Sequence, residues 1–273
     1  MALAITTNVA SLNAQRQLLK STNAMGTTFQ RLSSGLRINS AKDDAAGLSI
    51  STRMTAQVRG LNQAARNAND AVSMVQVADG ALEETTNALQ RIRELAVQAA
   101  NDTLVSGDRK DIQKEVNQLM SEIDRIAANT QFNDQYLLSG GFSAKKFHVG
   151  EDKDQTLQVS ILRADTASLF NVTTILVSNQ QSAEATITRI DNALNSVSDI
   201  RATLGSYQNR LESIINNLAN VSENTTAARS RIIDADIAAE TAALTRNAIL
   251  QQAGTAILAQ ANQQPQIALK LLG

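Results

Sequence analysis

Apolar residues recur every three or four positions over most of this chain, which is the period of an amphipathic helix. From Val58 to Ala96 one apolar row at seven-residue spacing runs without a break, through Leu61, Ala68, Val75, Leu82, Leu89 and Ala96. After a break at 101–107, a second segment has coiled-coil spacing, with apolar residues at Ile112, Val116, Leu119, Ile123 and Ile126. We therefore predict one long helix over 58–96 and a second that Asp108 caps and that ends near Asn129.

The helical period is lost in the middle of the chain and then returns. Between 139 and 182, apolar and polar residues alternate, which predicts a β-hairpin at about 145–149 and 156–162. From residue 187 a seven-residue row resumes through Ile190, Val197, Leu204, Leu211 and Leu218. This predicts a second long helix, long enough to lie along the first.

Both ends of the chain carry apolar rows at helical spacing. The first end has the rows Ile5, Leu12, Leu19 and Leu18, Met25, Leu32; the last has Ile237, Leu244, Leu258 and Leu250, Ile257, Leu271. A terminal helix with such rows and no core beside it needs a partner. We expect the two ends to pair with each other and with other copies of the chain, and Pro265 to break the last helix.

The order of elements is symmetrical about the hairpin and predicts a mainly α fold. An antiparallel return of the chain would bring 1–35 beside 235–273 and 58–128 beside 187–222. The expected architecture is a long antiparallel, coiled-coil-like helical bundle with one small β-hairpin. Residues 33–57, which include Gly35 and Gly47, would connect its two layers.

The composition narrows the class of protein. The hydrophobic fraction is 43% but the aromatic fraction only 3%, and there is one proline, which favours long thin helical seams over a thick core. A net charge of −1 without a basic block argues against nucleic acid as a partner. We expect no membrane insertion and no cleaved signal peptide, because no run of apolar residues is long enough. The absence of cysteine fits either a cytosolic protein or one exported unfolded.

Candidate chemistry is sparse, and we predict neither catalytic residues nor a metal or cofactor site. His148 is the only histidine and has no partners for a metal site or a catalytic triad. Asp43 and Asp44 lack further ligands at a binding spacing, so capping or pairing between subunits is the better interpretation. Gly35 and Gly47 fit backbone hinges rather than a phosphate-binding loop. An enzyme is the weakest hypothesis.

Several long runs of sequence, spread over nearly all of 1–140 and 185–273, resemble bacterial flagellin. The runs are 30–47 in the connector, 90–98, 131–133, 228–236, 251–254 and 261–266. The resemblance implies a subunit of the flagellar filament whose paired termini form the inner tube, D0, and whose next layer, D1, holds three long helices and a hairpin. The short middle segment implies a form with D0 and D1 alone.

The domain boundaries that this resemblance implies follow the predicted elements. They are 1–35 for the N-terminal D0 helix, 36–57 for the connector, 58–138 for the N-terminal D1 helices, 139–182 for the hairpin region, 183–226 for the C-terminal D1 helix and 227–273 for the C-terminal D0 helix. Since the terminal helices lack a core of their own, we expect them to be disordered in the monomer and to fold on assembly.

The resemblance also implies an extracellular location and a set of partners. They are other copies of the chain, hook–filament junction and cap proteins, and an export chaperone that covers Ile237–Leu272 before assembly. Export would follow the flagellar type III route. An innate immune Toll-like receptor would contact Arg91, Leu95 and Glu115. Arg91 and Glu115 also fit ordinary lateral filament contacts or solvated charges.

Two alternatives stay open at this point. A hook–filament junction protein of the same superfamily shares helical termini but not usually this full set of runs. A coiled-coil scaffold would explain the heptads but not the connector or the mirrored ends.

Overall fold

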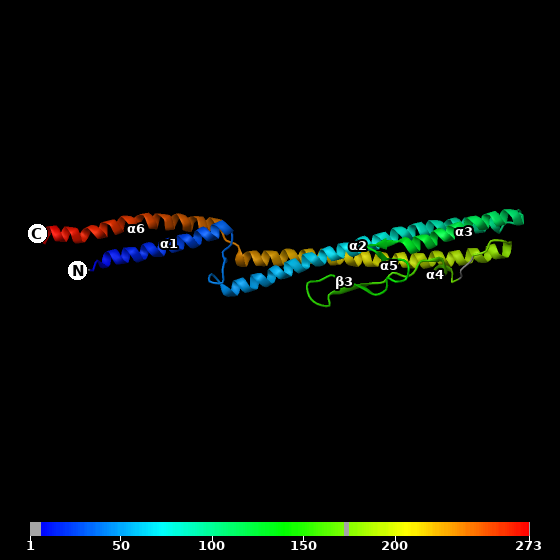
Figure 1. Ribbon diagram of the computed structural model, residues 1–273, viewed down its shortest axis with the longest axis horizontal. Helices are drawn as coiled ribbons and strands as arrows, with labels where there is room; N and C mark the ends of the chain where they lie inside the picture. Colours follow the sequence, from blue (N-terminus) through cyan, green and yellow to red (C-terminus); the bar gives the residue numbers. More distant parts are fainter. Residues whose placement is uncertain (1–6, 172–174, 273) are drawn as a thin grey trace. The chain divides into compact units, whose positions relative to one another are not determined.

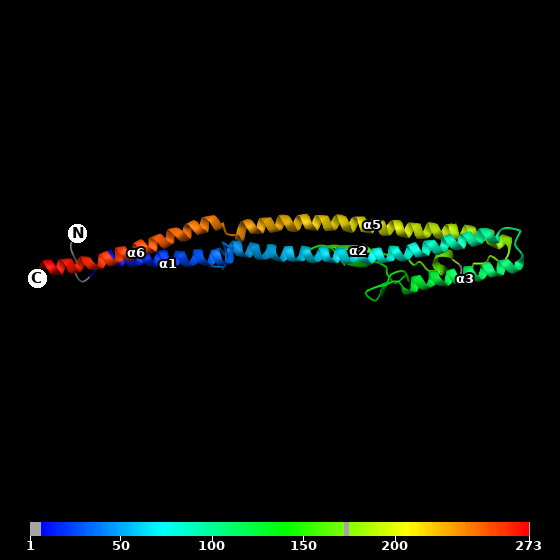
Figure 2. The same cartoon turned by 90° about the horizontal axis from the view of Figure 1, so that it is seen from above.

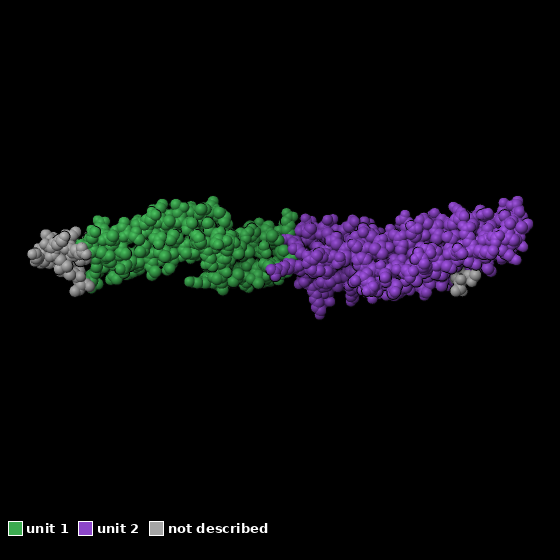
Figure 3. All heavy atoms as spheres, turned by 45° about the horizontal axis from the view of Figure 1, so that its top comes forward, with its two compact units in different colours: residues 1–58, 223–273 green, residues 59–222 purple. Residues whose placement is uncertain are grey.

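The computed structural model describes residues 7–171 and 175–272, with side chains described up to residue 263 in the last helix. The chain divides into two compact units, residues 1–58 with 223–273, and residues 59–222 (Figure 3). The helices are α1 (Val9–Ser34), α2 (Ala45–Ala99), α3 (Ser106–Asn129), α4 (Thr166–Phe170), α5 (Gln180–Ile233) and α6 (Ile237–Leu272). The strands are β1 (Gln131–Phe132), β2 (Gln135–Tyr136), β3 (Lys145–His148) and β4 (Thr156–Val159).

In the unit 59–222, α2 and α5 run antiparallel, and α3 folds back along α2 (Figures 1 and 2). Ion pairs link α2 to α5. Arg201 Nε lies 2.8 Å from Asp79 Oδ1, Arg201 Nη2 lies 3.6 Å from Glu83 Oε2, and Arg93 Nε lies 2.8 Å from Asp191 Oδ1. The predicted mainly α fold with antiparallel long helices is therefore confirmed.

The core of this unit consists of the apolar rows that the sequence places on its helices. All six members of the α2 row are buried, as is the α5 row Ile190, Val197, Leu204, Leu211 and Leu218. From α3, Val116 and Ile123 are fully buried against them. Burying a Val, Leu or Ile side chain stabilises the fold by about 1.5–3 kcal/mol, so these rows contribute much of the stability of the bundle. Phe142 and Phe170 are buried in the same core.

The predicted β-hairpin is present and packs on this core. β3 and β4 pair antiparallel with Phe147 opposite Leu157, and Leu157 and Val159 of β4 are buried. β4 ends at Val159, before the predicted end at 162. A second pair, β1 with β2, was not predicted; its turn places Asn133 and Asp134 at φ 48° and 60°, a left-handed conformation that Asn and Asp tolerate.

In the other unit, α1 and α6 lie side by side (Figures 1 and 2). Asn8 Nδ2 donates to the carbonyl of Ala261 at 2.8 Å, while Arg31 near the other end of α1 pairs with Glu240 at 3.1 Å. The helices are therefore antiparallel, and the expected pairing of the two chain ends is confirmed.

Several helix boundaries differ from the predictions. α3 begins at Ser106, before the predicted cap Asp108, and α5 continues to Ile233, past the predicted boundary at 226. α2 begins at Ala45 rather than near Val58, so the second half of the expected connector is helical. The reason is that Asp44 caps the helix: its Oδ1 accepts the backbone N–H of Gly47 at 2.9 Å. α6 continues past Pro265 to Leu272, where a break was predicted. A single proline removes one backbone donor and kinks a helix more readily than it ends one.

Candidate assembly surfaces

Many of the large apolar side chains of α1 and α6 point away from the contact between these helices. Eight of them are between 45% and 65% exposed: Val9, Leu12, Leu19, Phe29, Ile237, Ile249, Leu250 and Ile257. Isolated exposed leucines are ordinary on a protein surface, whereas a row of them along two paired helices marks an interaction site.

The contact between α1 and α6 is built from small and hydroxyl-bearing residues. Ser11, Ser21, Thr28 and Ala261 are buried there. Leu18 Cδ1 lies 3.4 Å from the position of a Cβ on Gly254. The sequence did not single out the three hydroxyl residues, although Ser21 and Thr28 stand seven apart.

The predicted seam residues divide between these two surfaces. Leu32, Leu244 and Leu258 are half-buried, whereas Leu12, Leu19, Ile237, Leu250 and Ile257 are exposed. Ile5 and the side chain of Leu271 lie outside the described residues. Each terminal helix therefore has one row toward its partner and another toward solvent.

A backbone clasp joins the two breaks between helices in this unit. After α1 ends, Gly35 adopts a left-handed φ of 71°, as expected for a glycine beyond a helix end. Ala235 N–H donates to the carbonyl of Gly35 at 2.9 Å, and Arg37 N–H donates to the carbonyl of Ile233 at 2.6 Å. This clasp could not be predicted from the pattern of side chains, since backbone atoms make it.

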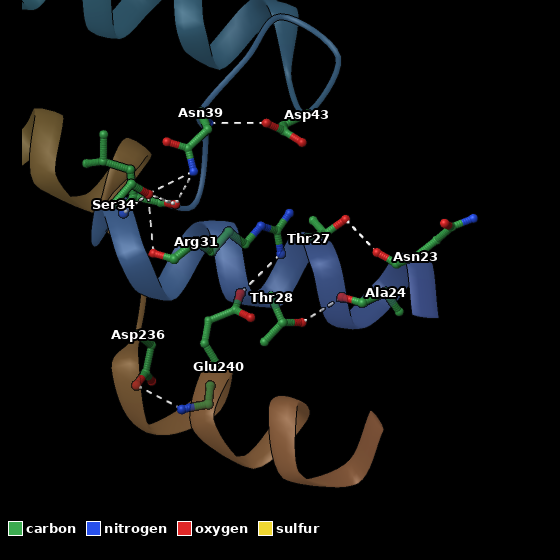
Figure 4. A network of polar contacts seen from close by, with 12 residues as sticks. Asn23, Ala24, Thr27, Thr28, Arg31, Ser34, Asn39, Asp43, Asp236 and Glu240 are labelled. Atoms are coloured by element: carbon green, nitrogen blue, oxygen red, sulfur yellow. Dashed lines mark hydrogen bonds and ion pairs between the residues drawn. The ribbon is translucent and has the colours of Figure 1, made fainter. Parts of the chain in front are cut away.

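The connector carboxylates act as caps. Asp43 Oδ2 accepts from the hydroxyl and the backbone N–H of Ser40, both at 2.9 Å. It also accepts from Asn39 N–H at 3.2 Å (Figure 4). These hydrogen bonds, those of Ser40 foremost, lower the pKa of Asp43. Asp44 caps α2. Gly47 lies in the first turn of α2, so the hinge interpretation fails there; it is a close-packing position instead.

The α2–α3 face brings two of the three predicted receptor residues together. Arg91 Nη2 lies 2.9 Å from Glu115 Oε1, and Arg91 Nη1 lies 3.0 Å from Glu94 Oε2. Both carboxylates raise the pKa of Arg91, through hydrogen bonds with Glu94 and then Glu115. Leu95 is 2% exposed and belongs to the core, so its side chain supports the face from beneath. Glu94 was not singled out from the sequence.

The described residues contain neither a metal-binding cluster nor a helix that could span a membrane. Within 7–171 and 175–272 no three His, Cys, Asp or Glu residues are grouped to hold a metal ion. No helix in that part of the chain is both long and apolar enough to cross a membrane. His148 is exposed on β3.

The fold defines a mainly helical structural protein, and comparison with known proteins gives its family. The family model described as the bacterial flagellin N-terminal helical region matches residues 5–143, and that for the C-terminal helical region matches 187–272. The flagellin of Halalkalibacterium halodurans is 45% identical over 266 residues, covering 97% of this chain and 98% of the relative. Flagellin FlaB1 of Treponema pallidum is 43% identical over 280 residues, covering 97% and 98%.

A solved structure agrees with these relatives. The crystal structure of Bacillus cereus flagellin matches with a TM-score of 0.52 and 35% identity, over 60% of this chain and 94% of that chain. The chain belongs to the bacterial flagellin family. It is a structural protein of the flagellar filament and not an enzyme, and the family matches favour this assignment over a junction protein or a coiled-coil scaffold.

Proposed function

We propose that this flagellin is exported unfolded through the flagellar type III route, without a cleaved signal, and that α1 and α6 fold as each subunit joins the filament. One observation carries the proposal: each of these helices exposes a row of large apolar residues, such as Leu19 and Ile257, away from the contact between them. A lone pair of helices joined through small residues buries little apolar surface, which does not offset its ordering entropy. Neighbouring subunits would supply the missing burial.

The composition supports export of an unfolded chain. There is no cysteine to form a disulfide and one proline to isomerise slowly. An export chaperone would cover the segment Ile237–Leu272 before assembly, since this segment carries exposed apolar residues such as Ile249 and Ile257. Hook–filament junction and cap proteins would be neighbours at the two ends of the filament.

The domain assignment follows from the same reasoning. Residues 1–35 and 227–273 would form the inner D0 layer, 36–57 its connector, and 58–138 with 183–226 the D1 helices, with the hairpin region 139–182 on D1. In a helical filament one face of a subunit binds a different face of the next copy. The charged faces of α2 and α3 would make such lateral contacts in D1.

The α2–α3 face is also proposed as the surface that the Toll-like receptor recognises. Arg91 and Glu115 support this, because they are adjacent, exposed and held by their ion pair in one geometry. Leu95 would act only through the packing of α2. Its side chain is buried and would not contact the receptor directly.

Circular dichroism of the dilute monomer tests folding on assembly. We expect helicity well below that of filaments grown by adding ammonium sulfate, and long uniform filaments by negative-stain imaging. Deletion of residues 1–30 should abolish polymerisation while the unit 59–222 keeps its thermal unfolding transition. A fully helical dilute monomer, or filaments from the deleted chain, would refute the proposal.

A further inference from the structure

We infer that the ion pair between Arg31 and Glu240 sets the register in which α1 and α6 pair. Arg31 lies in the last turn of α1 and Glu240 in the first turn of α6, and Figure 4 shows the two side chains meeting between the helices. The inference rests on the proposal that these helices fold together as the subunit enters the filament. It assigns the two residues a positioning role in that step.

The contact between α1 and α6 has no large, fully buried side chain among its described residues to fix the register. Its buried residues are small: Ser11, Ser21, Thr28 and Ala261, with Gly254 against Leu18. Displacing one helix by a turn would bring Leu250 or Leu258 to the position of Gly254 against Leu18, so this one close approach also opposes displacement. In coiled coils, a buried polar residue fixes the register when the packing does not.

The geometry of the pair suits this role. Arg31 Nη1 and Glu240 Oε1 are 3.1 Å apart, with the side chains 31% and 15% exposed. Displacement by one turn moves the partners about 5.4 Å apart along the helix axis. Both charges would then be left half-buried and unpaired, which is strongly unfavourable.

A contribution to stability alone does not explain the ion pair between Arg31 and Glu240. Arg31 Nε is buried and makes no hydrogen bond to any described residue, so part of the guanidinium is desolvated without compensation. Replacing buried ion pairs by apolar residues often leaves stability unchanged or raises it, and fixing a register is the best-attested reason to keep one. The backbone clasp at Gly35 and Ala235 lies next to the pair and is the competing explanation for the register.

Disulfide trapping can read the register directly, because the chain has no cysteine of its own. A Cβ at Gly254 would lie 4.0 Å from Leu18 Cβ, within the range that a disulfide requires. Leu18→Cys with Gly254→Cys therefore reports the register of the structure. Leu18→Cys with Leu250→Cys, or with Leu258→Cys, reports displacement by one turn in either direction.

The disulfide yields are compared in mildly oxidised filaments, with and without Arg31→Met/Glu240→Leu, which removes both charges and keeps apolar bulk. With the native pair, we expect the 18–254 disulfide to exceed each displaced one by about tenfold, and the apolar variant to lose most of this preference. Arg31→Lys should keep it. A matched control, Arg16→Met/Arg246→Leu, removes exposed charges from the same helices and should also keep it.

Two results would overturn the inference. The first is an undiminished preference in the apolar variant, which would assign the register to the clasp or to packing. The second is that oxidised chains migrate as dimers, which would place the contact between subunits. If the apolar variant does not polymerise alone, its disulfides are read in filaments grown with excess unmodified chain. A fully helical dilute monomer would refute folding on assembly but leave the disulfide ratios interpretable.

Discussion

Asp44 closes over Gly47 at the start of α2. The Asp44 Oδ1 accepts the backbone N–H of Gly47 at 2.9 Å, and a Cβ on Gly47 would lie 2.5 Å from Oδ2 of the same carboxylate and 2.7 Å from Ile38 Cδ1. The helix cap and the packing of Ile38 therefore both depend on the absence of a side chain at residue 47.

The change Gly47→Ala should destabilise the start of α2. Alanine is the better helix former by about 1 kcal/mol. To accommodate it, however, the Asp44 carboxylate must move and lose a cap worth about 1 kcal/mol, and Ile38 must repack as well. We expect faster amide hydrogen exchange in the first turn of α2 and a lower melting temperature of filaments.

Gly80→Ala in the same helix is the matched control. Nothing lies within 4 Å of a Cβ built on Gly80, so the gain in helix propensity should stand alone and stabilise by up to about 1 kcal/mol. Equal effects of the two substitutions would show that the Asp44–Gly47 fit does not matter.

Replacing an outward apolar residue of the terminal helices, as in Leu19→Gln or Ile257→Gln, should impair assembly and leave the subunit intact. Each side chain is more than half exposed in the single chain. Loss of its burial against neighbours should raise the critical concentration for polymerisation by about tenfold or more. Sedimentation of filaments measures this concentration. Gln17→Ala, an exposed polar position on α1, is the control, and a similar effect of all three changes would contradict the assignment of the surface.

The change Arg91→Ala should sharply lower signalling by the monomer through the Toll-like receptor, because it removes the charge that Glu94 and Glu115 hold at the α2–α3 face. Thermal unfolding should change little, since the pairs are exposed. Arg125→Ala is the comparison, because Arg125 is also exposed and paired with a glutamate, Glu122. An unchanged response to the Arg91 variant would remove this residue from the recognised surface.

Glu151 on the hairpin loop should make the stability of the unit 59–222 depend on pH. Burial, with a smaller contribution from Asp152, raises the pKa of Glu151 above its ordinary value of 4.5. The folded state therefore holds this proton more tightly, so stability is highest below the ordinary pKa and falls as the pH rises through the raised one. Glu151→Gln, which stays neutral, should raise the melting temperature near neutral pH.

Melting temperatures of the monomer, measured from about pH 4 to about pH 8, test this sign. The difference between Glu151→Gln and the unmodified chain should grow as the pH rises. A constant difference would mean that a lost contact of the side chain, rather than its charge, is responsible.

Periodicity predicted the helices because it reports burial directly. The rows through Val75 and Leu204 lie in the core, and the alternation around Leu157 marks the hairpin. The same periodicity locates Leu95 in the core, between the buried Ile92 and Ala99 of the same helix face. That spacing was not applied to Leu95 in the prediction, which followed the resemblance and made this residue a receptor contact.

Features that depend on backbone atoms or on single short contacts could not be predicted from the sequence. The start of α2 is set by one carboxylate, Asp44, and the clasp by carbonyls of Gly35 and Ile233. The β1–β2 pair has only two residues in each strand, too few to show a period. Among the assembly surfaces, the inward position of Ser21 and Thr28 was missed because polar residues at helical spacing are normally assigned to solvent.

The backbone clasp has a mechanical consequence. Tension transmitted from α1 to α2 must pass through the single strand of chain at Gly35, and tension from α5 to α6 through the strand at Asp234. The hydrogen bonds of Ala235 to Gly35 and of Arg37 to Ile233 bridge these two antiparallel segments. A force that pulls on one segment therefore loads these hydrogen bonds in shear and is shared with the other segment. In a filament under rotational drag, these two single-stranded connections would then yield together rather than one after the other.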